Sequence, residues 1–196
     1  MRLLGRLRVT AGISSDLTVR SERQVEKTQG LLQKSVSAAL WREIVIEIKK
    51  SATADSRTCD VSQVSKETLL ASSRQHIGDV VKAMAFFSGK LIEAAGEHDY
   101  DKLTAIDWFF SDFRTKFEEH GWWDNHRKIH RHHLGQADGV PEDVNLLDVL
   151  EYIADCVMAG MARAGDIYPL EMSDELIQRA FRNTVALMKS QVVVVE

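Results

Sequence analysis

Histidines and acidic residues gather in the middle of this chain in a way that suits metal chemistry. All seven histidines lie between His76 and His133, and five of them fall within the run HGWWDNHRKIHRHH at residues 120–133. Imidazole nitrogens and carboxylate oxygens are the ligands that hydrolytic transition-metal sites use. A divalent-metal site is therefore the first chemistry that the sequence indicates.

The motif His98-Asp99-x-x-Lys102 lies where a long helix is expected to end and the next to begin. A histidine and an adjacent aspartate at the start of a helix can point at one metal ion. A lysine one turn later then lies within reach of a phosphate bound to that ion. Adjacent His and Asp residues also occur often on ordinary surfaces, so the dipeptide alone is a weak signal.

Three acids follow on a later apolar helix, at Asp148, Glu151 and Asp155. At ~100° per residue these side chains fall within about 60° of one another on the helix circumference. No Lys or Arg occurs between Pro141 and Ala162, whereas solvated faces usually mix both signs. Close carboxylates in apolar surroundings repel one another unless a cation holds them. This helix alone leaves a metal ion, a basic partner and a plain solvated face all open.

The histidine run contains His126-x-x-x-His130, one helical turn apart, and then His132-His133. For any one of these residues a basic, solvated turn is the simpler interpretation, and the set is a stronger signal than its members. His76 lies on the expected long helix among apolar neighbours, where a lone histidine is most often part of the core.

Apolar residues recur every three or four positions along most of the chain, which is typical of amphipathic helices. Residues 51–65 are small and polar and are expected to form a linker. The expected helices cover residues 18–42, 66–95, 101–119, 144–163 and 173–191, and residues 122–133 are expected to form a short helix or a turn.

We therefore expect an all-α protein. A basic N-terminal helical segment and linker, residues 1–65, would precede a helical metal-binding domain of about five to six helices, residues 66–196. The β-branched stretch Ile44–Ile48 could be either the end of the preceding helix or a short strand, and the tail Val192–Val195 is strand-like. They are expected to pair with each other.

Composition limits the function further. The chain has 196 residues, 44% hydrophobic and 28% charged, with a net charge of −4, which is ordinary for a globular protein. Its acidic body argues against a broad nucleic-acid-binding surface, and the absence of ~18 consecutive apolar residues argues against a membrane span. Two cysteines form no disulfide framework or metal motif. We expect a cytoplasmic protein of a bacterium or a phage-infected host, although the arginine-rich start leaves organelle targeting as a weaker alternative.

The order His76, His98-Asp99-x-x-Lys102, His132-His133 and Asp155 on consecutive helices resembles the HD-domain superfamily of metal-dependent phosphohydrolases. That resemblance implies an HD-like helical domain with one or two ions. The implied ligands are His76, His98, Asp99 and Asp155, with His132 or His133 adding a second ion.

Residues 70–188 also look like a small phage and bacterial helical family of unknown function, with the motifs HDxSKL, NRHHPE and NLLDLxEMxxDW. The likeness rests on the segments QHIGDVVKA, EHDYDKL, HRHHL, DVNLLDVLEYIADC and FRNT. The chain departs from that pattern at Leu134-Gly135, where the family has Pro-Glu, and at Cys156, where it has Trp.

The leading hypothesis is a divalent-metal-dependent phosphohydrolase that acts on a nucleotide or another small phosphate ester. The ion would be Mn, Co, Ni, Fe, Zn or Mg, and it would activate a water molecule. Lys102 would neutralise developing phosphate charge, with Arg131 or Arg163 as weaker candidates. Asp148 and Glu151 would orient the metal ligands or act as general base.

The alternative is a non-catalytic helical interaction protein, phage-encoded, that binds a partner and retains a metal site. Its N-terminal helix would serve partner contact or homo-oligomer formation. A purely structural zinc site is less favoured, because structural sites prefer thiolate ligands and both cysteines look poorly placed.

Overall fold

The computed structural model describes residues 45–51 and 55–196. The described residues belong to one compact unit of the chain. The expected helix at residues 18–42 and the proposed oligomer contact through it lie outside the described residues.

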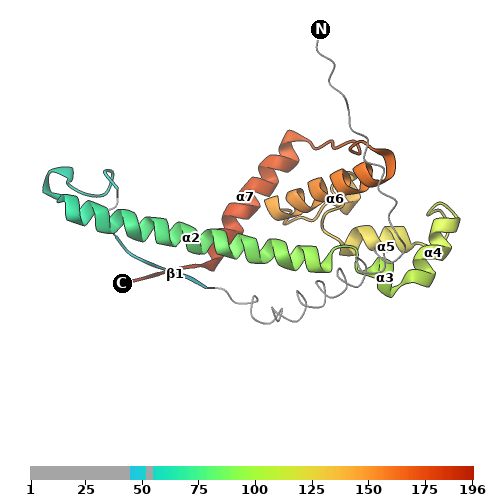
Figure 1. Ribbon diagram of the computed structural model, residues 1–196, viewed down its shortest axis with the longest axis horizontal. Helices are drawn as coiled ribbons and strands as arrows, with labels where there is room; N and C mark the ends of the chain where they lie inside the picture. Colours follow the sequence, from blue (N-terminus) through green and yellow to red (C-terminus); the bar gives the residue numbers. More distant parts are fainter. Residues whose placement is uncertain (1–44, 52–54) are drawn as a thin grey trace, which may run out of the picture. The chain divides into compact units, whose positions relative to one another are not determined.

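The described residues form a helical body, so the all-α prediction is confirmed (Figure 1). Two short 3-10 turns, η1 (Val61–Gln63) and η2 (Ala137–Gly139), interrupt the connections. The strands are β1 (Ile46–Lys49) and β2 (Val192–Val195). The α-helices are α2 (Lys66–Glu97), α3 (Asp101–Thr104), α4 (Ile106–Arg114), α5 (Trp122–Ile129), α6 (Leu146–Ala164) and α7 (Asp174–Gln191).

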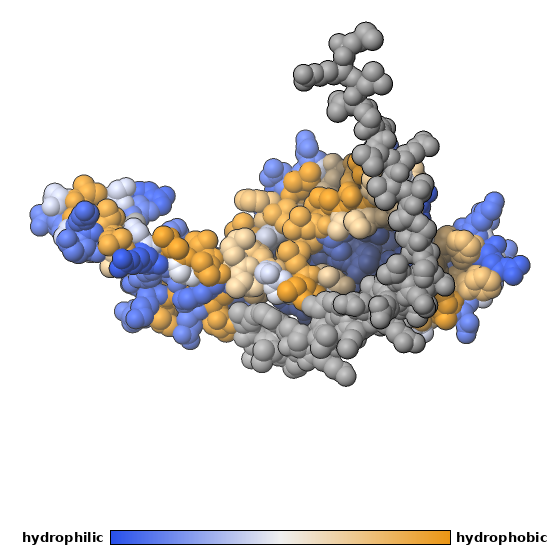
Figure 2. Space-filling view, in the orientation of Figure 1, coloured by the Kyte–Doolittle hydropathy of each residue, from blue (hydrophilic) through white to orange (hydrophobic). Residues whose placement is uncertain are grey.

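Helix α2 is the longest element, and its 32 residues correspond to about 48 Å at 1.5 Å per residue. It begins where the sequence predicts, with the Ser65 hydroxyl accepting a hydrogen bond from the Thr68 backbone N–H. Its contacts within the unit are with α6 and β1. Many of its apolar side chains stay exposed, among them Ile77 and Met84, and Figure 2 shows apolar side chains along this helix. His98 and Asp99, both predicted metal ligands, follow directly at the end of α2.

The single helix expected at residues 101–119 is instead broken into α3 and α4, and α4 ends at Arg114. Lys116 and Phe117 then adopt positive φ angles of 58° and 67°. The fully buried Asp112 carboxylate accepts hydrogen bonds from the backbone N–H groups of His120 and Trp123, both at 2.9 Å. These bonds fold the chain back toward α5, which periodicity alone does not reveal.

The two strands pair in parallel, with Ile46 opposite Val192 and Lys49 opposite Val195. The expected pairing of the two strand-like stretches is thus confirmed. Ile46 is buried, and the Lys82 ammonium of α2 donates a 2.7 Å hydrogen bond to the Glu47 carbonyl of β1. The pair therefore joins the start of the described body to its end along one side of α2.

Helices α6 and α7 pack around the main apolar core. Asn145 caps α6, and a capping box links its side chain and backbone with Asp148. This cap fixes where the acidic face of α6 begins. The buried members of the core are Leu134, Val144, Tyr152, Cys156 and Ala180. Within the described residues no helix is both long enough and apolar enough to cross a bilayer.

Candidate metal centre

The end of α2 turns two ligand-type side chains toward one place. His98 is the C-cap of α2, and the next residue, Asp99, has a φ of 53°. A positive φ is uncommon for a residue other than glycine, although aspartate tolerates it better than most. The turn at Asp99 brings its carboxylate, at 15% side-chain exposure, beside the His98 imidazole.

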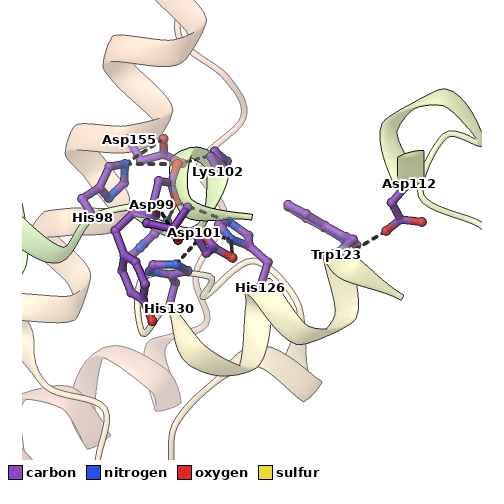
Figure 3. A network of polar contacts seen from close by, with 12 residues as sticks. His98, Asp99, Asp101, Lys102, Asp112, Trp123, His126, His130 and Asp155 are labelled. Carbon is purple, nitrogen blue, oxygen red and sulfur yellow. Dashed lines mark hydrogen bonds and ion pairs between the residues drawn. The ribbon is translucent and has the colours of Figure 1, made fainter. Parts of the chain in front are cut away.

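His98 contacts carboxylates with both of its ring nitrogens. Its Nδ1 lies 2.9 Å from Glu151 Oε1, and its Nε2 lies 3.5 Å from Asp99 Oδ2 and 3.7 Å from Asp155 Oδ1 (Figure 3). Glu151 and Asp155 are on the same face of α6, so this helix presents its acids to the end of α2. The contacts account for the acidic face that the sequence predicts on α6.

His132 approaches the same two carboxylates from the segment after α5. Its Nδ1 lies 2.9 Å from Glu151 Oε1, and its Nε2 lies 3.5 Å from Asp99 Oδ1. The side chain is buried, and its ring centroid is 4.5 Å from that of His98. Glu151 therefore faces two imidazoles whose Nε2 atoms face Asp99.

His126 of α5 repeats this arrangement with a different carboxylate. Its Nδ1 lies 2.9 Å from both Asp101 oxygens, and its Nε2 lies 3.3 Å from Asp99 Oδ1. His130 Nε2 contacts Asp101 Oδ1 at 2.8 Å. Figure 3 shows Asp101 between the two imidazoles.

His133 is a further, partly buried imidazole of the group. Its ring centroid lies 4.2 Å from that of His132 and 4.7 Å from that of His126. Gly139 packs against it so closely that a Cβ atom there would lie 2.7 Å from the His133 carbonyl oxygen. A side chain at position 139 would therefore displace the backbone that carries His133.

Several of the facing atoms have no hydrogen-bond partner among the described residues. These buried atoms include Asp99 Oδ1 and the Nε2 atoms of His126, His132 and His133. Buried polar atoms normally find partners. Lone pairs that face one another across 3.3–3.5 Å repel unless a proton or a cation lies between them. The residues present fit a metal ion, since their donor atoms are of the type that transition metals prefer.

The pKa values reflect the crowding of charges. Burial alone would raise the pKa of Asp99, but the adjacent Lys102 ammonium group holds it well below its usual range. Burial opposes the charge on Glu151 as well, and the facing His132 and His98 lower its pKa to about 2. Burial lowers the pKa of His133 to about 3, and the neighbouring imidazoles add to that shift. Both carboxylates are therefore ionised and both can only accept hydrogen bonds at neutral pH.

The potential ligand atoms form four overlapping groups, each within 4.8 Å. Asp99 belongs to three of the four, so its carboxylate is the centre of the cluster. The groups are His98/His132/Glu151, Asp99/His126/His130, Asp99/His132/His133 and His98/Asp99/Asp155. The described part of the chain thus holds buried His and Asp side chains positioned to hold a metal ion.

The structure brings together most of the residues that the sequence singles out. The predicted ligands His98, Asp99 and Asp155 meet there, as do His132 and His133. Lys102 forms an ion pair with Asp99 Oδ2 at the edge of the cluster, and Glu151 lies inside it.

His76 is the predicted ligand that the structure does not bring to the cluster. It is exposed and lies on α2, 22 residues before His98. That separation corresponds to about 33 Å along a continuous helix, so one ion cannot contact both imidazoles.

Asp148 lies outside the ligand groups and contacts the segment that carries the histidines. Its carboxylate accepts hydrogen bonds from Arg131, at 2.8 and 2.9 Å, and from the Asn145 backbone N–H, at 2.8 Å. Asp148 therefore anchors the histidine-bearing segment to the start of α6 and belongs to none of the ligand groups. Arg131 is engaged in this contact, and Arg163 is exposed near the end of α6.

Sequence reasoning did not assign roles to His126, His130 and Asp101. The His-x-x-x-His spacing was a signal for the first two. Asp101 lies two residues after Asp99, but nothing in its spacing shows that it meets α5.

No family model, no curated protein and no solved structure matches this chain.

Proposed function

We propose that this protein is a divalent-metal-dependent phosphohydrolase with an HD-like helical domain, acting on a nucleotide or another small phosphate ester. The observation that carries the proposal is the convergence of three imidazole Nε2 atoms on one carboxylate. His98, His126 and His132 each direct Nδ1 to a carboxylate and Nε2 to Asp99. Carboxylates that hold the other ring nitrogen are a recurrent feature of metal-binding histidines.

Two sets of residues would hold the metal. One is His98, Asp99 and Asp155, and the other is Asp99, His132 and His133, with Asp99 common to both. The imidazoles in these sets favour Fe, Co, Ni or Zn over Mg, which prefers oxygen ligands. A bound ion of this kind lowers the pKa of water and draws charge from a phosphoryl oxygen.

Lys102 is the residue best placed to receive a phosphate. Its side chain is 32% exposed, and its ammonium group sits on Asp99 Oδ2. It can turn from this carboxylate to an entering phosphate and neutralise charge that develops there.

Glu151 and Asp155 divide the roles that remain. Glu151 is held by His98 and His132, so it orients ligands. Asp155 is more exposed, at 30%, and its nearest ion-pair contact is at 3.7 Å. Asp155 therefore remains available as a metal ligand, which is its role in the first set of residues.

The test is to measure metal content and hydrolysis together. Asp99→Asn should lose bound metal by elemental analysis and lower the turnover of nucleotides and aryl phosphates, assayed with Mn, Co or Ni, by at least about 100-fold. The matched control is Asp107→Asn, an exposed aspartate in the first turn of α4, which should match wild type. Wild-type protein that carries no metal after exposure to these ions would rule the proposal out.

A second candidate is a helical interaction protein that keeps the metal site without turnover. It is favoured by the exposed apolar side chains of α4, where Ile106, Phe110 and Phe113 are 53%, 56% and 59% exposed. Contiguous exposed apolar surface often marks a binding site. Bound metal without turnover on any phosphate ester, together with a stably co-purifying partner, would select this candidate.

A further inference from the structure

The buried carboxylate of Asp101, at the start of α3, contacts the imidazoles of two histidines. Asp101 is 5% exposed, and its partners His126 and His130 are 0% and 5% exposed. Asp101 Oδ1 lies 2.9 Å from His126 Nδ1 and 2.8 Å from His130 Nε2. An ionised aspartate only accepts hydrogen bonds, so both imidazoles must donate to it.

This donation fixes which nitrogen of His126 carries the proton. With the proton on Nδ1, Nε2 presents a lone pair to Asp99 Oδ1 at 3.3 Å. The other neutral tautomer would set the Nδ1 lone pair against both Asp101 oxygens at 2.9 Å, which is repulsive. Hydrogen bonds of this kind determine the tautomer of a buried histidine.

The ring plane of His126 is fixed as well. The Trp122 ring stacks on it with centroids 4.5 Å apart and planes 19° apart, and Trp123 lies at 5.5 Å and 26°. The two stacks therefore hold the ring in this plane, and the Nδ1 contact with Asp101 opposes a 180° flip within it. Nε2 is buried and has no hydrogen-bond partner among the described residues.

We propose that His126 is a further metal ligand through Nε2, and that Asp101 is the positioning residue that holds His126 in the required tautomer and orientation. The inference rests on the metal site of the proposed function. It adds His126 as a ligand and Asp101 as its positioning residue, and neither belongs to the sequence motifs that indicated the site.

The Glu151 side of the cluster supports the same interpretation independently. Glu151 Oε1 lies 2.9 Å from the Nδ1 atoms of both His98 and His132, whose Nε2 atoms also face Asp99. The buried Asp101 of α3 and the partly buried Glu151 of α6 thus each contact imidazoles that face one central aspartate. Asp101 contacts Nδ1 of His126 in the same way that Glu151 contacts Nδ1 of His98 and of His132.

The first experiment is a double-mutant cycle in the full-length protein. The Kd for Zn²⁺ and Co²⁺ is measured by competition with a chromophoric chelator in wild type, Asp101→Asn, His126→Gln and the double variant. Asp101→Asn should weaken binding about 10- to 100-fold, and His126→Gln at least as much. The double variant should be no weaker than His126→Gln alone, because Asp101 acts through His126. His120→Gln, an exposed histidine of the same run, should leave the Kd unchanged.

The second experiment reads the tautomer directly and does not require a variant to fold. Nitrogen-15 NMR of the metal-free wild type should show His126 protonated at Nδ1 and unprotonated at Nε2. Added Zn²⁺ should shift the Nε2 resonance. A proton on Nε2 of neutral His126, or an Nε2 resonance that Zn²⁺ does not move, would overturn the inference.

The remaining outcomes separate the two proposals. If Asp101→Asn lowers the melting temperature but leaves the Kd unchanged, or if the two substitutions are additive, Asp101 is only structural and the inference fails. A wild type that binds Zn²⁺ through His126 but hydrolyses no phosphate ester overturns the proposed activity and leaves this inference standing. A wild type that binds no metal overturns both.

Discussion

Asp99 concentrates several unfavourable features in one residue. It combines a φ of 53°, a half-buried carboxylate and imidazole lone pairs on more than one side. Features of this kind persist where the surrounding structure holds them, and they cluster at functional sites. A cation at this carboxylate would convert the opposing lone pairs into ligands, so the local strain and the proposed metal site have the same explanation.

The sequence predicts many of the residues of the metal cluster, and the residues that it assigns wrongly or leaves out have physical explanations. His98, Asp99 and Asp155 are recognisable because residue type and adjacency carry their signal. His76 lies 22 residues before His98 on a helix that the sequence predicts to be continuous, and residue type and order alone do not register that the helical rise then separates the two by about 33 Å. Asp101 needed knowledge of the partner helix, which no local pattern supplies.

His133 should make the metal-free protein less stable in acid. Burial lowers its pKa to about 3, whereas an unfolded histidine titrates near ~6.5. The unfolded chain therefore binds a proton first, and the free energy of unfolding should fall as pH drops from about 6.5 toward 3. In His133→Gln the fall over this range should be smaller. Urea unfolding in the presence of a chelator, at several pH values, measures both.

Two other histidines also contribute to the change in the free energy of unfolding with pH. Burial also lowers the pKa of His130, which adds to the loss of stability in acid. The hydrogen bond to Glu151 raises the pKa of His98, and its contribution is present at low pH and lost as pH rises through the raised value. A His133→Gln variant with the same pH dependence as wild type would show that His133 is not the residue responsible.

At the scale of elements, the start of α6 links fold and site. Asp148 accepts hydrogen bonds from both the Asn145 backbone and Arg131. Arg131 lies between His130 and His132 in the sequence, so the cap of α6 also positions the segment that carries them. The sequence predicts the acidic face of α6. It does not predict that Asp148 caps the helix while Glu151 and Asp155 face the histidine cluster.

Asp148→Asn should lower the free energy of unfolding by about 1–3 kcal/mol, because it weakens a buried cap and a charged hydrogen bond together. The matched control is Asp143→Asn, which loses a contact with the same Arg131 at 3.0 Å but has a side chain that is 79% exposed. That change should cost less than about 1 kcal/mol. Chemical denaturation of the metal-free proteins compares them, and equal losses would contradict the anchoring role of Asp148.

The helix boundaries show the same limit of sequence reasoning. The starts of α2 and α7 follow from serine N-caps, which are local signals. The break between α3 and α4, and the turn after Arg114, depend on Asp112 accepting backbone hydrogen bonds from residues 120 and 123. Local sequence patterns therefore predict the starts of these helices well. They do not predict helix ends that depend on contacts with residues distant in the sequence.

At the scale of the whole described body, the cluster joins parts that are far apart in the sequence. Its members come from the end of α2, the start of α3, α5, the segment after α5, and α6. The parallel pair of β1 and β2 separately joins residues 46–49 to residues 192–195. An ion bound at Asp99 would therefore crosslink most of the helical body.

Metal should accordingly stabilise the folded protein by linkage. Ligand at about 100 times its Kd adds about 2.7 kcal/mol to the free energy of unfolding, which corresponds to a rise in Tm of roughly 5–10 °C for a chain of this size. The rise should disappear with a chelator and in His98→Ala, which removes a nitrogen facing Asp99. His76→Ala is the matched control, because it removes an exposed histidine from the same helix, and its Tm should rise as in wild type. A rise that is lost in His76→Ala but kept in His98→Ala would place the ion away from the cluster and contradict the arrangement described for α2.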